Sequence, residues 1–182
     1  MKALFSIFFT SFVLLSVHAK DDFSLTVFQT YDDYKSGKGQ QLFEFIGYDW
    51  TLGSLHLFYR VKKKDEGKVK VTTAWGFKIG DQTYRVIEGK PYRMLIEGKA
   101  IYYENGIAHL NMLIGDENSS DIELGGYSFL SQNLTSEIIE FPSNKAEKEF
   151  ESNAALKPLF ECVDKMKKHK TEKIRECVKE LL

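Results

Sequence analysis

The chain has 182 residues, of which 43% are hydrophobic and 14% aromatic, with only three prolines. This composition is typical of a globular protein and excludes a disordered chain. The formal net charge of −1, from 25 basic and 26 acidic side chains, excludes the strongly basic balance with which proteins capture nucleic acid or anionic lipid. We therefore expect no nucleic-acid partner.

Residues 1–19 have the features of a secretory signal peptide. Lys2 supplies a positive start, and an apolar run of 14 residues follows from Leu4 to Val17. A helix of this length is too short to span a bilayer, which needs about 20 residues. The small side chain of Ala19 suits a signal peptidase. We expect a mature chain of residues 20–182 that is exported, either periplasmic or secreted, without stable membrane insertion.

The mature chain is predicted to be a single domain with two parts. All 13 glycines lie at or before Gly126, and from Asn144 onward the chain is rich in Lys, Glu, Ala and Leu. The first composition favours strands and turns, and the second favours helices. Residues 20–143 are therefore expected to be mainly β, and residues 144–182 helical.

A short helix and two strands are expected early in the first part. The helix covers Thr30–Tyr34, where Thr30 can cap the helix and Asp33 suits the helix dipole. Residues Leu42–Ile46 and Leu55–Val61 are predicted to be strands, and a charged turn covers Lys62–Gly67.

A β-meander is expected next. Apolar residues alternate with polar ones from Val69 to Phe77, which predicts a strand with one buried face. Turn signals then recur about every nine residues, at Gly80, Gly89, Gly98 and Asn105-Gly106, and in the polar run 115–120. This spacing predicts an antiparallel meander of about seven or eight strands, which can curl toward a partial barrel.

Two amphipathic helices are predicted in the second part. Pro142-Ser143 can start a helix, and Pro158 suits a first helical turn. Apolar residues at helical spacing form two stripes, one over 156–166 and one over 174–181. A helical hairpin packed on the sheet buries both stripes, so the predicted fold class is α+β.

Cys162 and Cys177 are the only cysteines. In an exported protein such a pair suggests one disulfide. In one continuous helix the Cα atoms of the two residues would lie about 22 Å apart, whereas a disulfide allows roughly 7 Å between them. A disulfide therefore requires a turn between the two cysteines, for which His169–Glu172 is suitable. Two reduced, half-buried thiols are the alternative.

Several short motifs resemble those of a group of small secreted proteins from Bacteroidetes. They are Asp32-Asp33-Tyr34 with Gly37-Lys38, then Trp75-Gly76-Phe77, Tyr84-Arg85, Tyr92 and Tyr102-Tyr103-Glu104-Asn105-Gly106. The resemblance covers most of the mature chain. It implies a sheet punctuated by glycine and tyrosine, with a polar helical tail, in a bacterial cell envelope. It implies no activity and no catalytic residue.

The sequence contains no catalytic, metal-binding or cofactor-binding motif. His56 and His109 are both expected on strands, without an orienting carboxylate or a second ligand at a motif spacing. They are interpreted as ordinary strand histidines. The alternative is an envelope hydrolase in which His56 or His109 acts with an Asp or Glu that the fold brings close.

An aromatic and arginine patch is the strongest candidate site. Trp75, Tyr102 and Tyr103 belong to a cluster of aromatic residues in consecutive strands, and alternation turns either Tyr102 or Tyr103 away from the core. Arg85 and Arg93 are expected to share the face opposite the core. We therefore predict a non-enzymatic binding module for a small ligand or a protein partner. The alternatives are an aromatic core with arginines covering its solvated face, and a purely structural envelope protein.

Overall fold

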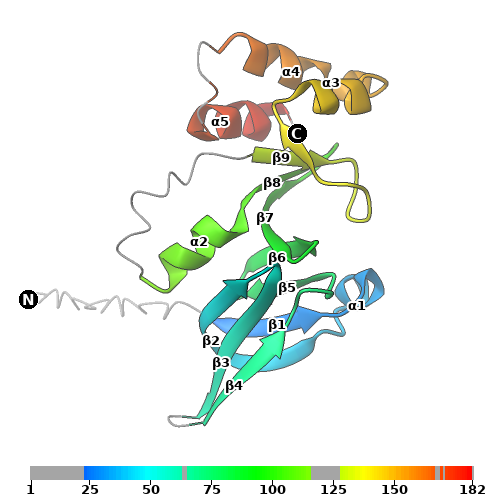
Figure 1. The fold of residues 1–182 in the computed structure, drawn as a ribbon. Coiled ribbons are helices and arrows are strands. Elements are labelled where there is room, and N and C mark those ends of the chain that lie inside the picture. Colours follow the sequence, from blue (N-terminus) through cyan, green and yellow to red (C-terminus); the bar gives the residue numbers. More distant parts are fainter. Residues whose placement is uncertain (1–22, 63–64, 116–127, 167–168, 170, 182) are drawn as a thin grey trace, which may run out of the picture.

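The computed structural model describes residues 23–62, 65–115, 128–166, 169 and 171–181. The predicted signal peptide, residues 116–120 of the polar run, and parts of the two predicted turns at 62–67 and 169–172 lie outside the described residues. The described part is an α+β protein with one antiparallel sheet and a group of C-terminal helices (Figure 1), as the sequence predicts.

The described residues form ten strands and five α-helices, with one short 3₁₀ turn. The strands are β1 (Ser24–Phe28), β2 (Gln40–Thr51), β3 (Ser54–Lys62), β4 (Asp65–Lys70), β5 (Gly76–Ile79), β6 (Gln82–Ile87), β7 (Lys90–Glu97), β8 (Ile101–Asn105), β9 (Ser128–Ser131) and β10 (Ile139–Phe141). The helices are α1 (Tyr31–Ser36), α2 (Gly106–Leu113), α3 (Asn144–Phe150), the 3₁₀ turn η2 (Ala154–Leu156), α4 (Lys157–Asp164) and α5 (Thr171–Leu181).

The sheet consists of two meanders joined side by side. Its strand order is β10-β9-β8-β7-β6-β5-β1-β2-β3-β4, and every neighbouring pair is antiparallel. The first meander runs from β1 to β4 and the second from β5 to β10, and the pairing of β1 with β5 joins them. The sheet is open, with β4 and β10 at its edges, so the expected curl toward a barrel does not reach closure.

The predicted strand Val69–Phe77 is wrong, because the chain changes partners within it. β4 ends at Lys70 beside β3, the backbone N–H of Ala74 donates to the carbonyl of Val71 in a turn, and β5 begins at Gly76 beside β1. The alternation of side chains continues through this turn, so the pattern by itself cannot separate the two strands. This split is one reason why ten strands are found where seven or eight were predicted.

The strand register defines two faces, which we call the inner and the outer face. Across β5 to β9, the inner face carries the row Phe77, Tyr84, Arg93, Glu104 and Ser128. The outer face carries the row Gly76, Arg85, Tyr92 and Asn105, with Tyr103 and Phe129 in the next row. Paired residues of neighbouring strands point to the same side of a sheet, so each row is a line of neighbouring side chains.

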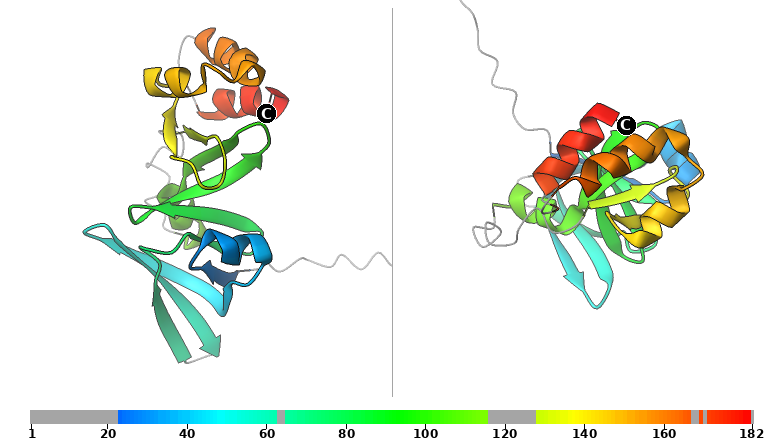
Figure 2. Two further views of the ribbon diagram at one scale, coloured as in Figure 1. Left: turned by 90° about the vertical axis from the view of Figure 1, so that its right-hand side faces the viewer. Right: turned by 90° about the horizontal axis from the view of Figure 1, so that it is seen from above.

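The inner face packs two hydrophobic cores. The first, which we call the α2 core, lies on β1 to β6 and includes Leu110 of α2. The second, which we call the helical core, lies on β8 to β10 under the C-terminal helices and includes Tyr102, Leu130, Phe141, Leu159 and Val178. The C-terminal helices and the β2–β4 end lie at opposite ends of the molecule (Figure 2).

The C-terminal helices form where the sequence predicts them. The Ser143 side chain caps α3 by accepting a hydrogen bond from the backbone N–H of Ala146, and Pro158 lies in the first turn of α4. Helices α4 and α5 pack together, and the Cys162–Cys177 disulfide joins them with Cα atoms 6.1 Å apart. The disulfide prediction is confirmed, and the bond is consistent with an exported protein. In the described part of the chain, no helix has the length and apolar character needed to cross a bilayer.

Helix α2 corrects the prediction for residues 105–113. Asn105-Gly106 was expected to be a hairpin turn followed by a strand that carries His109. Instead, the Asn105 side chain accepts hydrogen bonds from the backbone N–H groups of Ile107 (3.1 Å) and Ala108 (3.4 Å) and so caps a helix. Asparagine followed by glycine suits a tight turn, and asparagine also caps helices, so the same residues favour both structures.

Candidate functional site

Arg85 and Arg93 do not share a face of the sheet, contrary to the prediction. The turn between β6 and β7 contains only Glu88 and Gly89, which pairs Arg85 with Tyr92 and Tyr84 with Arg93. A two-residue turn thus places odd-numbered residues of β6 opposite even-numbered residues of β7. Arg85 lies on the outer face, and Arg93 lies on the inner face beside the core.

Tyr102 and Tyr103 both lie wholly inside the protein, so neither is turned toward solvent as expected. The Tyr102 hydroxyl contacts the hydroxyl of Ser128 at 2.8 Å and donates to Glu104 at 3.2 Å. The Tyr103 hydroxyl contacts the hydroxyl of Ser131 at 3.0 Å on the other face. Alternation does separate the two rings, but this region of the sheet is covered on both faces.

Trp75 is half-buried beneath α1 on the outer face. Its ring stacks on Tyr34 with centroids 4.2 Å apart and lies 5.8 Å from the ring of Tyr31. Its indole N–H donates to the carbonyl of Leu134 at 3.2 Å. The helix is positioned by a capping box, in which Thr30 and Asp33 bond each other's backbone N–H. The sequence predicts the cap at Thr30, and the bond that the Asp33 carboxylate accepts adds to it. These contacts give Trp75 a structural role in attaching α1.

A row of charged groups separates the two cores of the inner face. The guanidinium of Arg175 on α5 binds the Glu104 carboxylate through two hydrogen bonds of 2.9 and 2.8 Å. Glu104 is only 5% exposed, so this pair is largely withdrawn from water. The hydrogen bond to Glu104 raises the pKa of Arg175. Arg93 lies opposite Glu104 in the register and donates its Nε–H to Gln82 at 2.8 Å, and burial lowers the pKa of Arg93.

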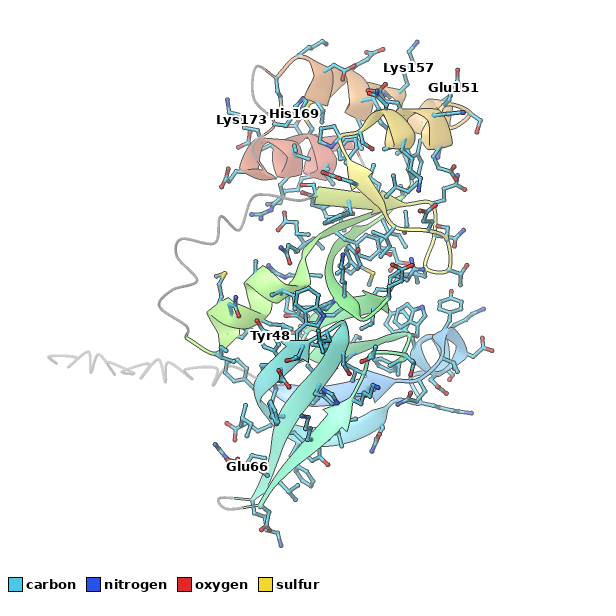
Figure 3. All side chains as sticks on the ribbon, viewed as in Figure 1. Tyr48, Glu66, Glu151, Lys157, His169 and Lys173 are labelled. Carbon is cyan, nitrogen blue, oxygen red and sulfur yellow. A yellow bond between two sulfur atoms is a disulfide. The ribbon has the colours of Figure 1, made fainter. Side chains whose placement is uncertain are left out.

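His109 is buried on α2 against the inner face. Its Nδ1 lies 2.5 Å from the hydroxyl of Tyr84, and burial, reinforced by the charge of Arg93, lowers the pKa of His109 to about 4. The imidazole is therefore neutral near pH 7, and burial raises the pKa of Tyr84. A second polar contact holds α2, because Tyr48 on β2 donates to the Asn111 side chain, and Figure 3 places Tyr48 beside α2.

His56 lies on β3 as predicted. Its Nδ1 is buried and makes no hydrogen bond within the described residues. The Nδ1 atom of His109 is hydrogen bonded to the hydroxyl of Tyr84. The register places Asp49 of β2 opposite His56, but the Asp49 carboxylate accepts a hydrogen bond from Thr51 at 2.7 Å and lies 3.8 Å from the Lys68 ammonium. No hydrogen bond between described residues joins a carboxylate to either histidine, and the hydrolase alternative stays a prediction.

Two hairpin tips meet at one edge of the molecule. Leu52-Gly53 between β2 and β3, and Glu88-Gly89 between β6 and β7, all have positive φ, between 50° and 74°. This conformation is that of the two-residue turns that match strand twist. A Cβ on Gly89 would lie 2.1 Å from the carbonyl oxygen of Gly53, so the two turns touch only because residue 89 is glycine.

A pocket of about 370 Å³ lies beside these tips. Its walls are mainly apolar, and three of its residues are aromatic. Tyr92 and Phe129 form an edge-to-face pair with centroids 4.9 Å apart, and Trp50 of the β2–β3 hairpin is 41% exposed. Lys90 and Asn105 add polar groups. The lining residues are Trp50, Lys90, Pro91, Tyr92, Asn105, Ile107 and Phe129.

This pocket can bind a small molecule that has a flat apolar part. Rings of tryptophan, tyrosine and phenylalanine offer large rigid surfaces, and a few polar groups at the wall orient the ligand. The sequence does not predict this site, because its walls come from five separate elements, β2, β7, β8, α2 and β9. Among these residues only Tyr92 and Asn105 belong to motifs that the sequence singles out, and neither motif indicates a pocket. Trp50 next to the Leu52-Gly53 turn was the available signal for an exposed aromatic residue.

A second groove of about 490 Å³ lies between α3 and α4. Its apolar floor contains Phe150 and Phe160, and its rim carries carboxylates and one lysine. Two of the rim residues, Glu151 at the end of α3 and Lys157 on α4, are labelled in Figure 3. The rim carboxylates are exposed and solvated, so they orient a ligand less strongly than buried polar groups do. The rim residues are Glu147, Glu151, Lys157, Glu161 and Asp164.

Among the residues that the structure describes, no group of three or more His, Cys, Asp and Glu side chains is placed to hold a metal ion. No protein-family model matches the chain, and searches of curated proteins and of solved structures find no significant match. The resemblance to secreted Bacteroidetes proteins stays a prediction.

Proposed function

We propose that this protein is a non-enzymatic binding protein, exported to a bacterial cell envelope and either periplasmic or secreted. We further propose that it binds a small ligand in the pocket beside the two hairpin tips. The observation that carries this proposal is the exposed Trp50 at a pocket whose wall already contains the Tyr92–Phe129 pair. An exposed tryptophan over an apolar pocket is a common anchor for ligands.

Three further observations support the proposal. The disulfide fits an oxidising compartment outside the cytoplasm. The described residues offer no bonded pair of histidine and carboxylate for acid–base chemistry. The predicted patch of Arg85, Arg93 and Trp75 is divided between two faces, whereas this pocket brings three aromatic residues together.

A thermal-shift screen against nucleotides, sugars, metals and cell-wall fragments tests the proposal. A ligand at about 100 times its Kd should stabilise the protein by roughly 2.7 kcal/mol, which raises Tm by on the order of 5–10 °C. The Trp50→Ala variant should lose most of this shift. Phe43→Ala is the matched control, because Phe43 is also an exposed aromatic of β2, 57% exposed, but lies outside the pocket. A ligand that the Trp50→Ala variant binds as tightly as the wild type does would contradict the proposed site. A screen in which no compound raises Tm would favour a protein partner.

A further inference from the structure

Arg85 is the one arginine that the described part of the chain leaves without a polar partner. It is 4% exposed, and its Nε and Nη1 atoms are buried with no hydrogen bond. The three other arginines all have partners: Arg60 with Glu44 and Glu66, Arg93 with Gln82, and Arg175 with Glu104.

An unpaired guanidinium inside a protein is unfavourable. Arginine keeps its charge under all ordinary conditions, so it cannot escape the cost of burial by losing a proton. Buried polar groups are otherwise almost always hydrogen bonded, and a buried charge without a partner is strongly destabilising. A group of this kind therefore indicates a partner outside the residues that the structure describes.

Arg85 is not itself a lining residue of the pocket, but it is the cross-strand neighbour of one. In the outer-face row, Arg85 is the cross-strand neighbour of Tyr92, and Tyr92 is the neighbour of Asn105. Tyr92 and Asn105 both line the pocket, so the arginine stands one strand away from the wall. Directly paired residues of neighbouring strands lie about 5 Å apart, which a long arginine side chain can span. Lys90 in the pocket wall adds a second positive charge.

We propose that the ligand of this pocket is an aromatic or apolar molecule with an anionic group, and that Arg85 binds that group. This inference rests on the proposed function and names its ligand class. The apolar part lies against Trp50 and the Tyr92–Phe129 pair, and the carboxylate or phosphate accepts hydrogen bonds from the guanidinium. Charge-assisted bonds of this kind are the strongest that arginine makes.

Benzoate and benzyl alcohol are a matched pair of probes, because they share a ring and differ in charge. The chain has two tryptophans, so a proton–nitrogen NMR spectrum contains two indole signals, one from the pocket (Trp50) and one from the α1 cluster (Trp75). In the wild type we expect both probes to shift the Trp50 signal, with benzoate binding at least about tenfold more tightly. Arg85→Met should remove most of this preference, leaving only the part due to Lys90, and should keep the response to benzyl alcohol. Arg60→Met, which removes an exposed arginine of β3, should keep the preference.

Equal affinities in the wild type, or a preference that is undiminished in Arg85→Met, would overturn the role of Arg85 and leave the proposed pocket intact. A Trp50 signal that responds to neither probe would contradict the pocket and the inference with it. The unfolding temperature of Arg85→Met without probe is an independent check. It should equal or exceed that of the wild type, because an unpaired buried charge has been removed. A large decrease would show that Arg85 is bound within the protein, and would overturn the inference.

Discussion

On the inner face of the sheet, the helical core is covered by three helices, two of which are joined by a disulfide, whereas the α2 core is closed by one helix of eight residues. The buried side of α2 holds two polar contacts, His109 with Tyr84 and Asn111 with Tyr48. The helical core is therefore stabilised by apolar contacts and a covalent bond. The α2 core depends in addition on two hydrogen bonds, and one of them, between His109 and Tyr84, weakens when His109 binds a proton. The first turn of α2 also forms part of the pocket wall.

Removing the disulfide should give the largest effect and should act mainly on the helical core. A double change of Cys162→Ala and Cys177→Ala opens a loop of about 15 residues and should lower the free energy of unfolding by about 3 kcal/mol in the chain-entropy model. Urea unfolding measures the loss. Hydrogen exchange should accelerate in α4 and α5 more than in α2. Equal acceleration in all three helices would show that the two cores are not held separately.

Arg175→Met tests the charged row between the cores. The change leaves the Glu104 carboxylate buried and without its bidentate partner, which should lower the free energy of unfolding by about 2–3 kcal/mol. This is a small loss for a broken buried ion pair, because the Arg175 side chain is 37% exposed. Arg60→Met is the control, since the ion pairs of Arg60 are exposed and should contribute less than about 1 kcal/mol. Similar losses in the two variants by urea unfolding would argue against a special role for the row.

Acid should weaken the α2 core selectively. The pKa of His109 is lowered to about 4 in the folded protein, against about 6.5 in the unfolded chain, so between these pH values the unfolded state binds more protons and stability falls as pH falls. From pH 7.5 to pH 5 the loss due to His109 should be at most about 2 kcal/mol. In His109→Gln this part of the pH dependence should vanish. An unchanged pH dependence of urea unfolding would show that His109 is not buried in its neutral form.

Trp50→Ala should have the smallest effect on stability, less than about 1 kcal/mol, because the side chain is partly exposed and lies outside both cores. A thermal scan without ligand measures this. A decrease as large as that expected for Arg175→Met would indicate that Trp50 holds the hairpin in place, and would weaken its assignment as a ligand anchor.

The sequence predicted the helical region better than the β region for physical reasons. The signals of α3 and α4, a capping serine at 143 and Pro158 in the first turn, act over a few neighbouring residues. The two faces of the sheet depend on the pairing across the two-residue β6–β7 turn, which places Arg93 opposite Tyr84. On β7 the register also shifts beyond Arg93, between Met94 and Ile96. Alternation within one strand reveals neither the pairing across a turn nor such a shift, and the unknown pairing across the β6–β7 turn placed Arg93 on the wrong face.

The pocket depends on contacts between distant parts of the chain, and its one local signal is Trp50 beside the Leu52-Gly53 turn. Trp50 and Phe129 are far apart in the sequence, and they line the same pocket because the β2–β3 hairpin reaches the β6–β7 turn. The contact between the two turns is made at Gly89, and the sequence around Gly89 does not predict that Gly53 lies next to it. The aromatic residues that the sequence did single out, Tyr102 and Tyr103, serve as buried hydrogen-bonded core residues.

Backbone NMR mapping of a ligand from the thermal-shift screen tests the central claim most directly. The account predicts that the largest chemical-shift changes fall on Trp50, Tyr92, Asn105 and Phe129, around the pocket at the hairpin tips, and that the α3–α4 groove at Phe150 stays unchanged. Changes concentrated in that groove, or spread evenly over both ends of the molecule, would contradict the assignment of the pocket as the binding site.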